Sequence, residues 1–150
     1  MIGRSQTSSK RLDGNVVRRS GTAATEFVLI LPVLIGIALG CVDLGRGVFS
    51  YIALTNAVRE GAMYGATTGF TDFTKASWET EIRSRVTEEM QNGNDYEAAD
   101  LTTSVTTETD ADDTVRLTVT GTYPFETIVD WPGLPHRIEL RHQVSMQRFR

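Results

Sequence analysis

Residues 18–32 of the chain read RRSGTAATEFVLILP. The stretch joins two basic residues, a glycine, one carboxylate at Glu26 and the start of an apolar run without further charge before Asp43. The 16 uncharged residues 27–42 reach about 24 Å as a helix, whereas a bilayer has a hydrocarbon core of roughly 30 Å. Extension back to Gly21 gives about 33 Å, so the segment spans a bilayer only if Glu26 lies within it or at its edge.

The charges on the two sides of this apolar run differ in sign. Residues 1–21 carry five basic residues and one acidic residue, a net charge of +4, and the remainder of the chain carries −8. An excess of basic residues before a span places the N-terminus in the cytoplasm. The acidic remainder is therefore expected outside the membrane, and its charge argues against nucleic acid as a partner.

Hydrophobic periodicity predicts an α+β fold. A helix is expected from Thr22 to about Ala66, its outer half presenting one face to a core (Leu44, Val48, Tyr51, Thr55, Val58 and Ala62). After a loop at 69–74, apolar residues at every fourth position predict a second helix with a buried stripe (Trp78, Ile82, Val86 and Met90). Three alternating segments then predict a three- or four-stranded antiparallel sheet, with a hairpin at 109–113 and a rigid exposed loop at 124–136.

Three residues of the apolar run favour close contact with other helices. Pro32 lacks an amide hydrogen and is expected to kink or loosen the helix. Gly36 and Gly40 are four residues apart and form a small-residue pair of the kind that lets membrane helices approach each other. Gly61 and Gly65 repeat this spacing further along. In a fibre subunit, such pairs are expected to form packing seams.

The spacing around Gly21 resembles the processing site of type IV pilin-like precursors, in which four residues separate a glycine from Glu26 and Phe27. The LILP run at 29–32 and the segment AVREGAMYGA at 57–66 narrow the resemblance to TadE-like minor pilins of the tight-adherence (Tad/Flp) pilus. The resemblance covers residues 18–66. Beyond them it is limited to the architecture of an outer helix-and-strand domain.

The resemblance implies a precursor that a prepilin peptidase cuts between Gly21 and Thr22. Residues 1–21 are then a basic cytoplasmic leader, residues 22–42 a transmembrane helix, and residues 43–150 an α+β domain that is periplasmic or extracellular. The expected location is the bacterial inner membrane, from which the chain could pass into the pilus. The implied partners are the peptidase, other Tad pilins and the pilus assembly platform, and the implied function is assembly of an adhesive pilus.

The position of Glu26 has a physical rationale within this scheme. Cleavage creates an ammonium group at Thr22 in a poorly solvated place, where an unpaired charge is costly. Four residues along a helix bring Glu26 one turn from its own amine, or present it to the amine of a neighbouring subunit. The carboxylate is therefore expected to fix the axial register of one helix beside another.

Other functions remain open from the sequence. The alternative to a pilin is an unprocessed, single-pass anchored binding domain, in which Glu26 lies at the interface. Ala38 to Cys41 loosely resembles a lipoprotein cleavage site, with acylation at Cys41, the single cysteine. An enzyme would need a catalytic signature, and neither a Gly-x-Ser-x-Gly sequence nor a phosphate-binding glycine loop is present.

The sequence gives no firm metal or cofactor site. Asp110, Asp112 and Asp113 are acidic residues in a predicted hairpin turn, where calcium is conceivable, but the glycine and distal glutamate of an EF-hand are missing. His136 and His142 lack further ligands at zinc-binding spacing. His142 is expected on the apolar face of its strand, as a hydrogen-bonded core residue. We therefore expect no cofactor, no metal and no catalytic residue.

Overall fold

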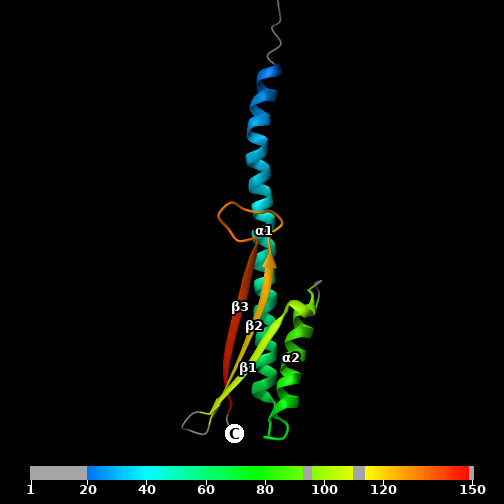
Figure 1. Cartoon of the computed structure of the whole chain (residues 1–150), viewed down its shortest axis with the longest axis vertical. Coiled ribbons are helices and arrows are strands. Elements are labelled where there is room, and N and C mark those ends of the chain that lie inside the picture. Colours follow the sequence, from blue (N-terminus) through cyan, green and yellow to red (C-terminus); the bar gives the residue numbers. More distant parts are fainter. Residues whose placement is uncertain (1–19, 93–95, 110–113, 149–150) are drawn as a thin grey trace, which may run out of the picture. The chain divides into compact units, whose positions relative to one another are not determined.

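A computed structural model of the chain describes residues 20–92, 96–109 and 114–148. The elements follow in the order α1 (Ser20–Thr67), α2 (Lys75–Gln91), the short 3-10 helix η1 (Ala98–Asp100), β1 (Thr102–Thr109), β2 (Val115–Glu126) and β3 (Arg137–Arg148) (Figure 1). The chain divides into two units between Ile37 and Ala38. The predicted α+β fold is confirmed, with three strands in the sheet.

The sheet is antiparallel in the order β1-β2-β3, so β2 lies in the centre. Its register pairs Val105 with Val119 on one side and Val119 with Val144 on the other. Because side chains alternate between the two faces of a strand, these valines lie on one face of the sheet. That face carries the core, and the opposite face carries polar side chains such as Thr118 and Thr120.

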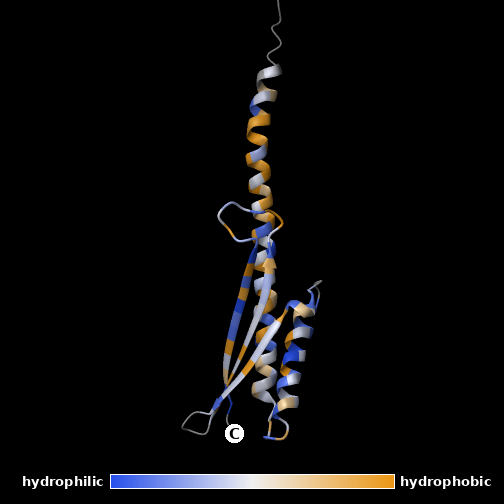
Figure 2. Cartoon of the chain, viewed as in Figure 1, coloured by the Kyte–Doolittle hydropathy of each residue, from blue (hydrophilic) through white to orange (hydrophobic). Residues whose placement is uncertain are grey.

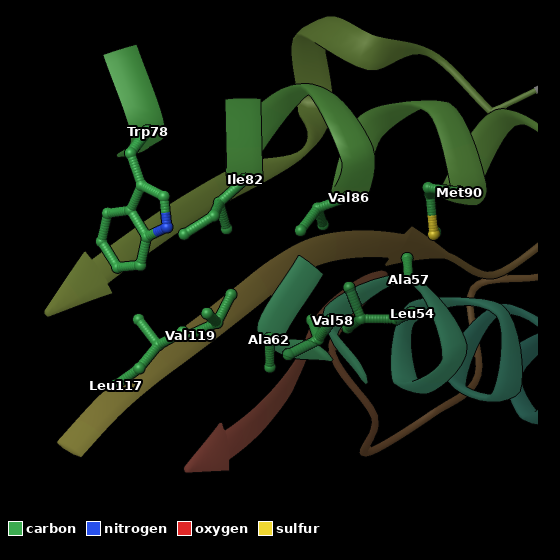
Figure 3. Packing of buried hydrophobic residues seen from close by; sticks show 10 residues of the cluster. All are labelled: Leu54, Ala57, Val58, Ala62, Trp78, Ile82, Val86, Met90, Leu117 and Val119. Atoms are coloured by element: carbon green, nitrogen blue, oxygen red, sulfur yellow. The ribbon is translucent and has the colours of Figure 1, made fainter. Parts of the chain in front are cut away.

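The core lies where α1 and α2 meet the central strand. All four residues of the predicted α2 stripe are buried, and they pack with α1 and β2 in one cluster (Leu54, Ala57, Val58, Ala62, Trp78, Ile82, Val86, Met90, Leu117 and Val119) (Figure 3). The Trp78 indole donates to the carbonyl oxygen of Thr68, 3.1 Å away. The ring therefore fixes α2 to the end of α1.

The predicted core face of α1 is only half correct. Val58 and Ala62 are buried, but Leu44, Val48 and Tyr51 are exposed. The core face of the helix instead runs back from Leu54 through Ser50 to Asp43, all three of them buried. Consecutive residues of a helix differ in direction by about 100°. Leu44, which follows Asp43, and Tyr51, which follows Ser50, therefore lie on a neighbouring face of α1.

The second glycine pair packs inside the fold and does not form a seam between subunits. A Cβ atom at Gly61 would collide with Val86 of α2, and one at Gly65 would collide with Leu117 of β2. Glycine at these positions therefore lets α1 approach α2 and the sheet closely. The absence of a side chain at Gly61 and Gly65 thus makes room for the core of the domain.

Truncation of the core is expected to be costly. Ile82 is fully buried among residues of both helices and the central strand, so Ile82→Ala should lower the free energy of unfolding by about 2–5 kcal/mol. The matched control is Ser84→Ala on the exposed side of α2, expected within about 0.5 kcal/mol of wild type. Tryptophan fluorescence during denaturant unfolding of the full chain in detergent measures both. Equal unfolding midpoints for the two variants would contradict this account of the core.

Candidate functional site: the apolar helix and its outer end

The residues of the predicted processing site lie in the first turns of α1, which begins at Ser20, two residues before the predicted start. Gly21 and Glu26 are exposed. The Thr25 hydroxyl donates to the carbonyl oxygen of Gly21 at 3.3 Å, and a Cβ atom added to Gly21 would meet nothing within 4 Å. The segment is therefore helical, and Thr22 and Glu26 are one turn apart along it.

Glu26 is a lone carboxylate at the start of an exposed apolar surface. Among the residues that the structure describes, it has neither an ion pair nor a hydrogen bond. Large apolar side chains that follow it are mostly exposed (Phe27, Val28, Leu29, Ile30, Leu31, Val33, Leu34, Ile35, Ile37, Leu39 and Val42). The hydropathy colouring shows this apolar stretch of α1 (Figure 2).

In the part of the chain that the structure describes, one helix is long and apolar enough to cross a membrane, the Ala23–Thr67 part of α1, and only 6% of its most apolar window is buried. A helix in the core of a soluble protein would bury this surface against its own chain. Exposure of a nearly uncharged run instead favours lipid or other apolar helices as its surroundings. The apolar helix can therefore span the membrane, with Glu26 near one end of the run.

The three predicted helix-packing residues have different surroundings. Pro32 lies inside α1, and the helix continues through it. A Cβ atom at Gly36 would meet nothing within 4 Å, whereas one at Gly40 would lie 3.5 Å from the Trp131 ring. Gly36 is thus open to another helix, and Gly40 contacts a tryptophan of its own chain. A role for Pro32, Gly36 and Gly40 in packing against other helices stays a prediction.

Asp43, the first charged residue after the apolar run, is the residue that the sequence analysis missed. Its carboxylate accepts hydrogen bonds from the backbone N–H groups of Ile128 at 2.9 Å and Val129 at 3.4 Å, and from the indole N–H of Trp131 at 3.0 Å. Arg46 adds a contact of 3.4 Å from one turn further along the helix. These bonds fasten the loop between β2 and β3 to α1.

The same bonds hold Asp43 in its charged form. The N–H group of Ile128, followed by the Trp131 indole, lowers the pKa of the Asp43 carboxyl below its ordinary value of 3.8, and burial opposes this shift only in part. A lowered pKa in the folded state stabilises the fold above the unfolded-state pKa, and that contribution is lost as the pH falls through the folded-state pKa. The loop anchor is therefore intact at neutral pH and weakens in acid.

Asp43→Asn tests this anchor. The amide can accept hydrogen bonds but carries no charge, so we expect a lower thermal midpoint than wild type near neutral pH. As the pH falls below 3.8, the ordinary pKa of an aspartate, toward the lowered pKa of Asp43 in the folded protein, the wild-type carboxyl loses its charge and the difference between the two proteins should shrink. Thermal unfolding of the full chain in detergent, followed by tryptophan fluorescence, measures both midpoints. A difference that stays constant across this pH range would contradict the charged anchor.

The predicted loop at 124–136 is exposed over most of its length, but its bounds need correction. Pro124 and Glu126 belong to β2, and the connecting loop, residues 127–136, closes through the N–H of Thr127 and the carbonyl of His136 at 3.0 Å. It is held against α1, and Trp131 is half-buried. A buried acid directly after a membrane span needs a partner. The need for a partner of Asp43 was the one signal in the sequence for this anchor, although the sequence does not say which residues provide it.

An apolar groove of about 500 Å³ runs between α1 and the segments on either side of this loop. Its walls include the α1 residues that leave the core face and side chains from the end of β2, the loop and β3 (Gly40, Leu44, Gly47, Val48, Tyr51, Phe125, Trp131, Leu134, Ile138 and Leu140). Tyr51 reaches His142 across the far end, with 3.3 Å between the phenol oxygen and Nδ1. The misassigned face of α1 is thus one wall of a groove.

Neither histidine belongs to a metal-ligand cluster formed by described residues. His136 lies 2.9 Å from Asp130, and His142, half-buried on the apolar face of β3, meets Tyr51. Within residues 20–92, 96–109 and 114–148, no three side chains of His, Cys, Asp or Glu lie close enough together to hold a metal. The hairpin turn with Asp110, Asp112 and Asp113 lies outside the described residues. Cys41 is exposed and lies within α1.

Comparison with known proteins identifies the segment that contains the candidate site. Residues 21–63 match the family of TadE-like proteins. This range begins at Gly21 and includes Glu26, the apolar run and Asp43. No curated protein and no solved structure matches the chain. The resemblance to the TadE-like family is therefore confirmed over residues 21–63.

Proposed function

We propose that the chain is a minor pilin that takes part in assembly of a Tad-type pilus for adhesion. The observation that carries the proposal is Glu26, an exposed carboxylate without a partner among the described residues, at the start of an exposed apolar helix in a TadE-like segment. A carboxylate costs about 2.5–3.5 kcal/mol at the centre of a bilayer and less toward the interface, near which Glu26 lies. A positive group supplied by pilin assembly would offset that cost.

In this proposal the precursor is inserted with residues 1–21 in the cytoplasm and residues 43–150 outside. A prepilin peptidase removes residues 1–21, and the new amine at Thr22 becomes available to Glu26 of the same or a neighbouring chain. The exposed apolar helix then packs against helices of other pilins, with Gly36 offering a place for close approach. The assembly platform and the other Tad pilins are the partners.

The size of the outer domain favours a minor subunit. A major pilin of this system is expected to resemble little more than the apolar helix, whereas this chain has 108 residues after residue 42. Those residues include a sheet and a second helix with their own core. A domain of this size would present surface at an end of the fibre or at intervals along it.

The experiment that tests pilus membership is fractionation of cells that carry the pilus system. We expect the chain in the sheared pilus fraction, and in the membrane fraction it should co-purify with the prepilin peptidase and other pilins. In cells without the peptidase it should stay in the membrane fraction only. The same distribution with and without the peptidase, and no other pilin in the purified complex, would contradict the proposal.

The apolar groove favours a second candidate, an unprocessed anchored binding domain. A concave apolar site of about 500 Å³ falls within the range of small-ligand sites. This candidate predicts that residues 1–21 remain on the membrane-bound protein and that the chain is absent from sheared pili. The two candidates are therefore separated by the N-terminus of the chain and by its distribution between membrane and fibre.

A further inference from the structure

The loop at 127–136 has an unusual surface for an outer connection. Exposed loops are generally polar, but Ile128 is 58% exposed and Leu134 60% exposed. The loop has one acidic residue, Asp130, and its carboxylate lies 2.9 Å from the ring of His136. The tip of the loop therefore presents apolar side chains and a single carboxylate, which lies within hydrogen-bond distance of His136.

This apolar loop is fixed at a defined height along α1. The three bonds to Asp43 hold its backbone and the Trp131 indole, and the Trp131 ring reaches back to Gly40. Three residues of helix correspond to about 4.5 Å. In Figure 1 the loop, in orange, lies beside the part of α1 that carries these residues. The loop thus covers only a short length of the helix.

That height coincides with the outer end of the proposed span. If residues 22–42 cross the bilayer, Gly40 lies in the last turn within the membrane and Asp43 is the first residue beyond it. Tryptophan is enriched at this depth, because its ring is apolar and its N–H is polar. Trp131 meets both conditions, since its ring lies near Gly40 and its N–H is bonded to Asp43.

We propose that the loop at 127–136 rests on the outer surface of the bilayer, with Ile128 and Leu134 among the lipids and Trp131 at the interface. The lipid surface occupies only the Gly40 end of the groove. The other end of the groove, at Tyr51, is 11 residues further along α1, a distance of about 16 Å from Gly40. That end therefore lies above the acyl chains. The loop would thereby fix the height of the outer domain above the membrane before assembly.

Lipid is favoured over a second protein because it follows from the span itself. A loop fastened to the last turn of a membrane helix meets lipid whether or not another subunit is near. The proposal rests on the membrane anchoring that the proposed function requires, but not on cleavage after Gly21. Its test must therefore separate failure of the span from failure of the loop.

The experiment uses the full chain with Cys41→Ser, reconstituted in phosphatidylethanolamine and phosphatidylglycerol vesicles. Single cysteines replace Leu134 in the loop, Leu34 in the apolar run and Phe73, which is 99% exposed in the connection between α1 and α2. Each carries a nitroxide, whose collisions with oxygen report on lipid and whose collisions with a nickel chelate report on water. Leu34→Cys is the control for the span, and Phe73→Cys is the control for an exposed apolar side chain in water.

We expect the oxygen-to-nickel collision ratio at position 134 to be several-fold above that at position 73 and below that at position 34. A ratio at 134 equal to that at 73, with 34 still in lipid, would overturn the loop placement and leave the span intact. Protection of 134 from both probes would mean that another protein covers the loop, which also overturns it. Water access at position 34 would remove the span and the proposed function together.

Discussion

Glu26→Ala is expected to leave the chain in the membrane but to remove it from the pilus. Loss of a carboxylate makes the apolar helix easier to insert, because a charge costs about 2.5–3.5 kcal/mol at the bilayer centre and less, but still something, near the end of the span where Glu26 lies. Without the carboxylate, however, the amine created at Thr22 would have to be buried unpaired during assembly. Membrane and sheared fractions, compared by immunoblot, should show normal membrane amounts and a nearly complete loss from the fibre.

Two further variants separate charge from other effects. Glu26→Gln keeps the shape and the acceptor oxygen but removes the charge, and we expect it to behave as Glu26→Ala does. Glu60→Ala removes a partly exposed carboxylate from the domain half of the same helix, and it should leave pilus entry unchanged. Wild-type amounts of Glu26→Ala in the sheared fraction would rule out the pairing.

Gly21→Val is expected to block removal of the leader completely. A prepilin peptidase has to accommodate the residue before the cut, and a branched side chain there would obstruct the approach of the peptide bond. The substitution should not disturb the chain itself, because a Cβ atom at Gly21 meets nothing within 4 Å. An immunoblot of the membrane fraction should show the full-length precursor and no shorter product.

The control for Gly21→Val is the same change at Gly45, another position of α1 where a Cβ atom meets nothing within 4 Å. Gly45→Val should be processed as wild type is. If Gly21→Val yields a product of mature length, the cut lies elsewhere or does not depend on this glycine, and the assignment of residues 1–21 as a leader fails.

Much of the fold was predictable because it depends on local periodicity. The stripe from Trp78 to Met90 recurs every four residues and is buried as a unit. The alternation in β2 is equally clear, with Val115, Leu117 and Val119 buried and their neighbours only half-buried. In both elements the residues that face the core recur at the period of the element itself, so each pattern can be recognised from a short stretch of sequence.

The outer end of α1 could not be predicted in the same way. The bond between Asp43 and Ile128 joins residues 85 positions apart, and periodicity carries no information on such a pair. The same limitation explains the error at Leu44 and Val48, whose spacing suits a core face although the core lies on the face of Asp43 and Ser50. Which face of a long apolar helix is buried depends on the sheet that packs against it.

For the candidate processing site, the sequence predicts more than the structure adds. Gly21, Glu26 and Phe27 were singled out because the segment resembles a pilin processing site, and the family match starts at Gly21. The structure adds that the segment is helical and that Glu26 is exposed. The pairing of Glu26 with an amine of another chain, or with the amine created by cleavage, stays a prediction.

The mass of the N-terminal peptide of the membrane-bound protein tests the central claim most directly. In cells that contain the prepilin peptidase, the account predicts a chain that begins at Thr22, and in cells without it a chain that still carries residues 1–21. A chain that keeps Gly21 in the presence of the peptidase would contradict processing. A chain that begins with an acylated Cys41 would contradict the pilin assignment itself, because Glu26 would no longer be part of the mature protein.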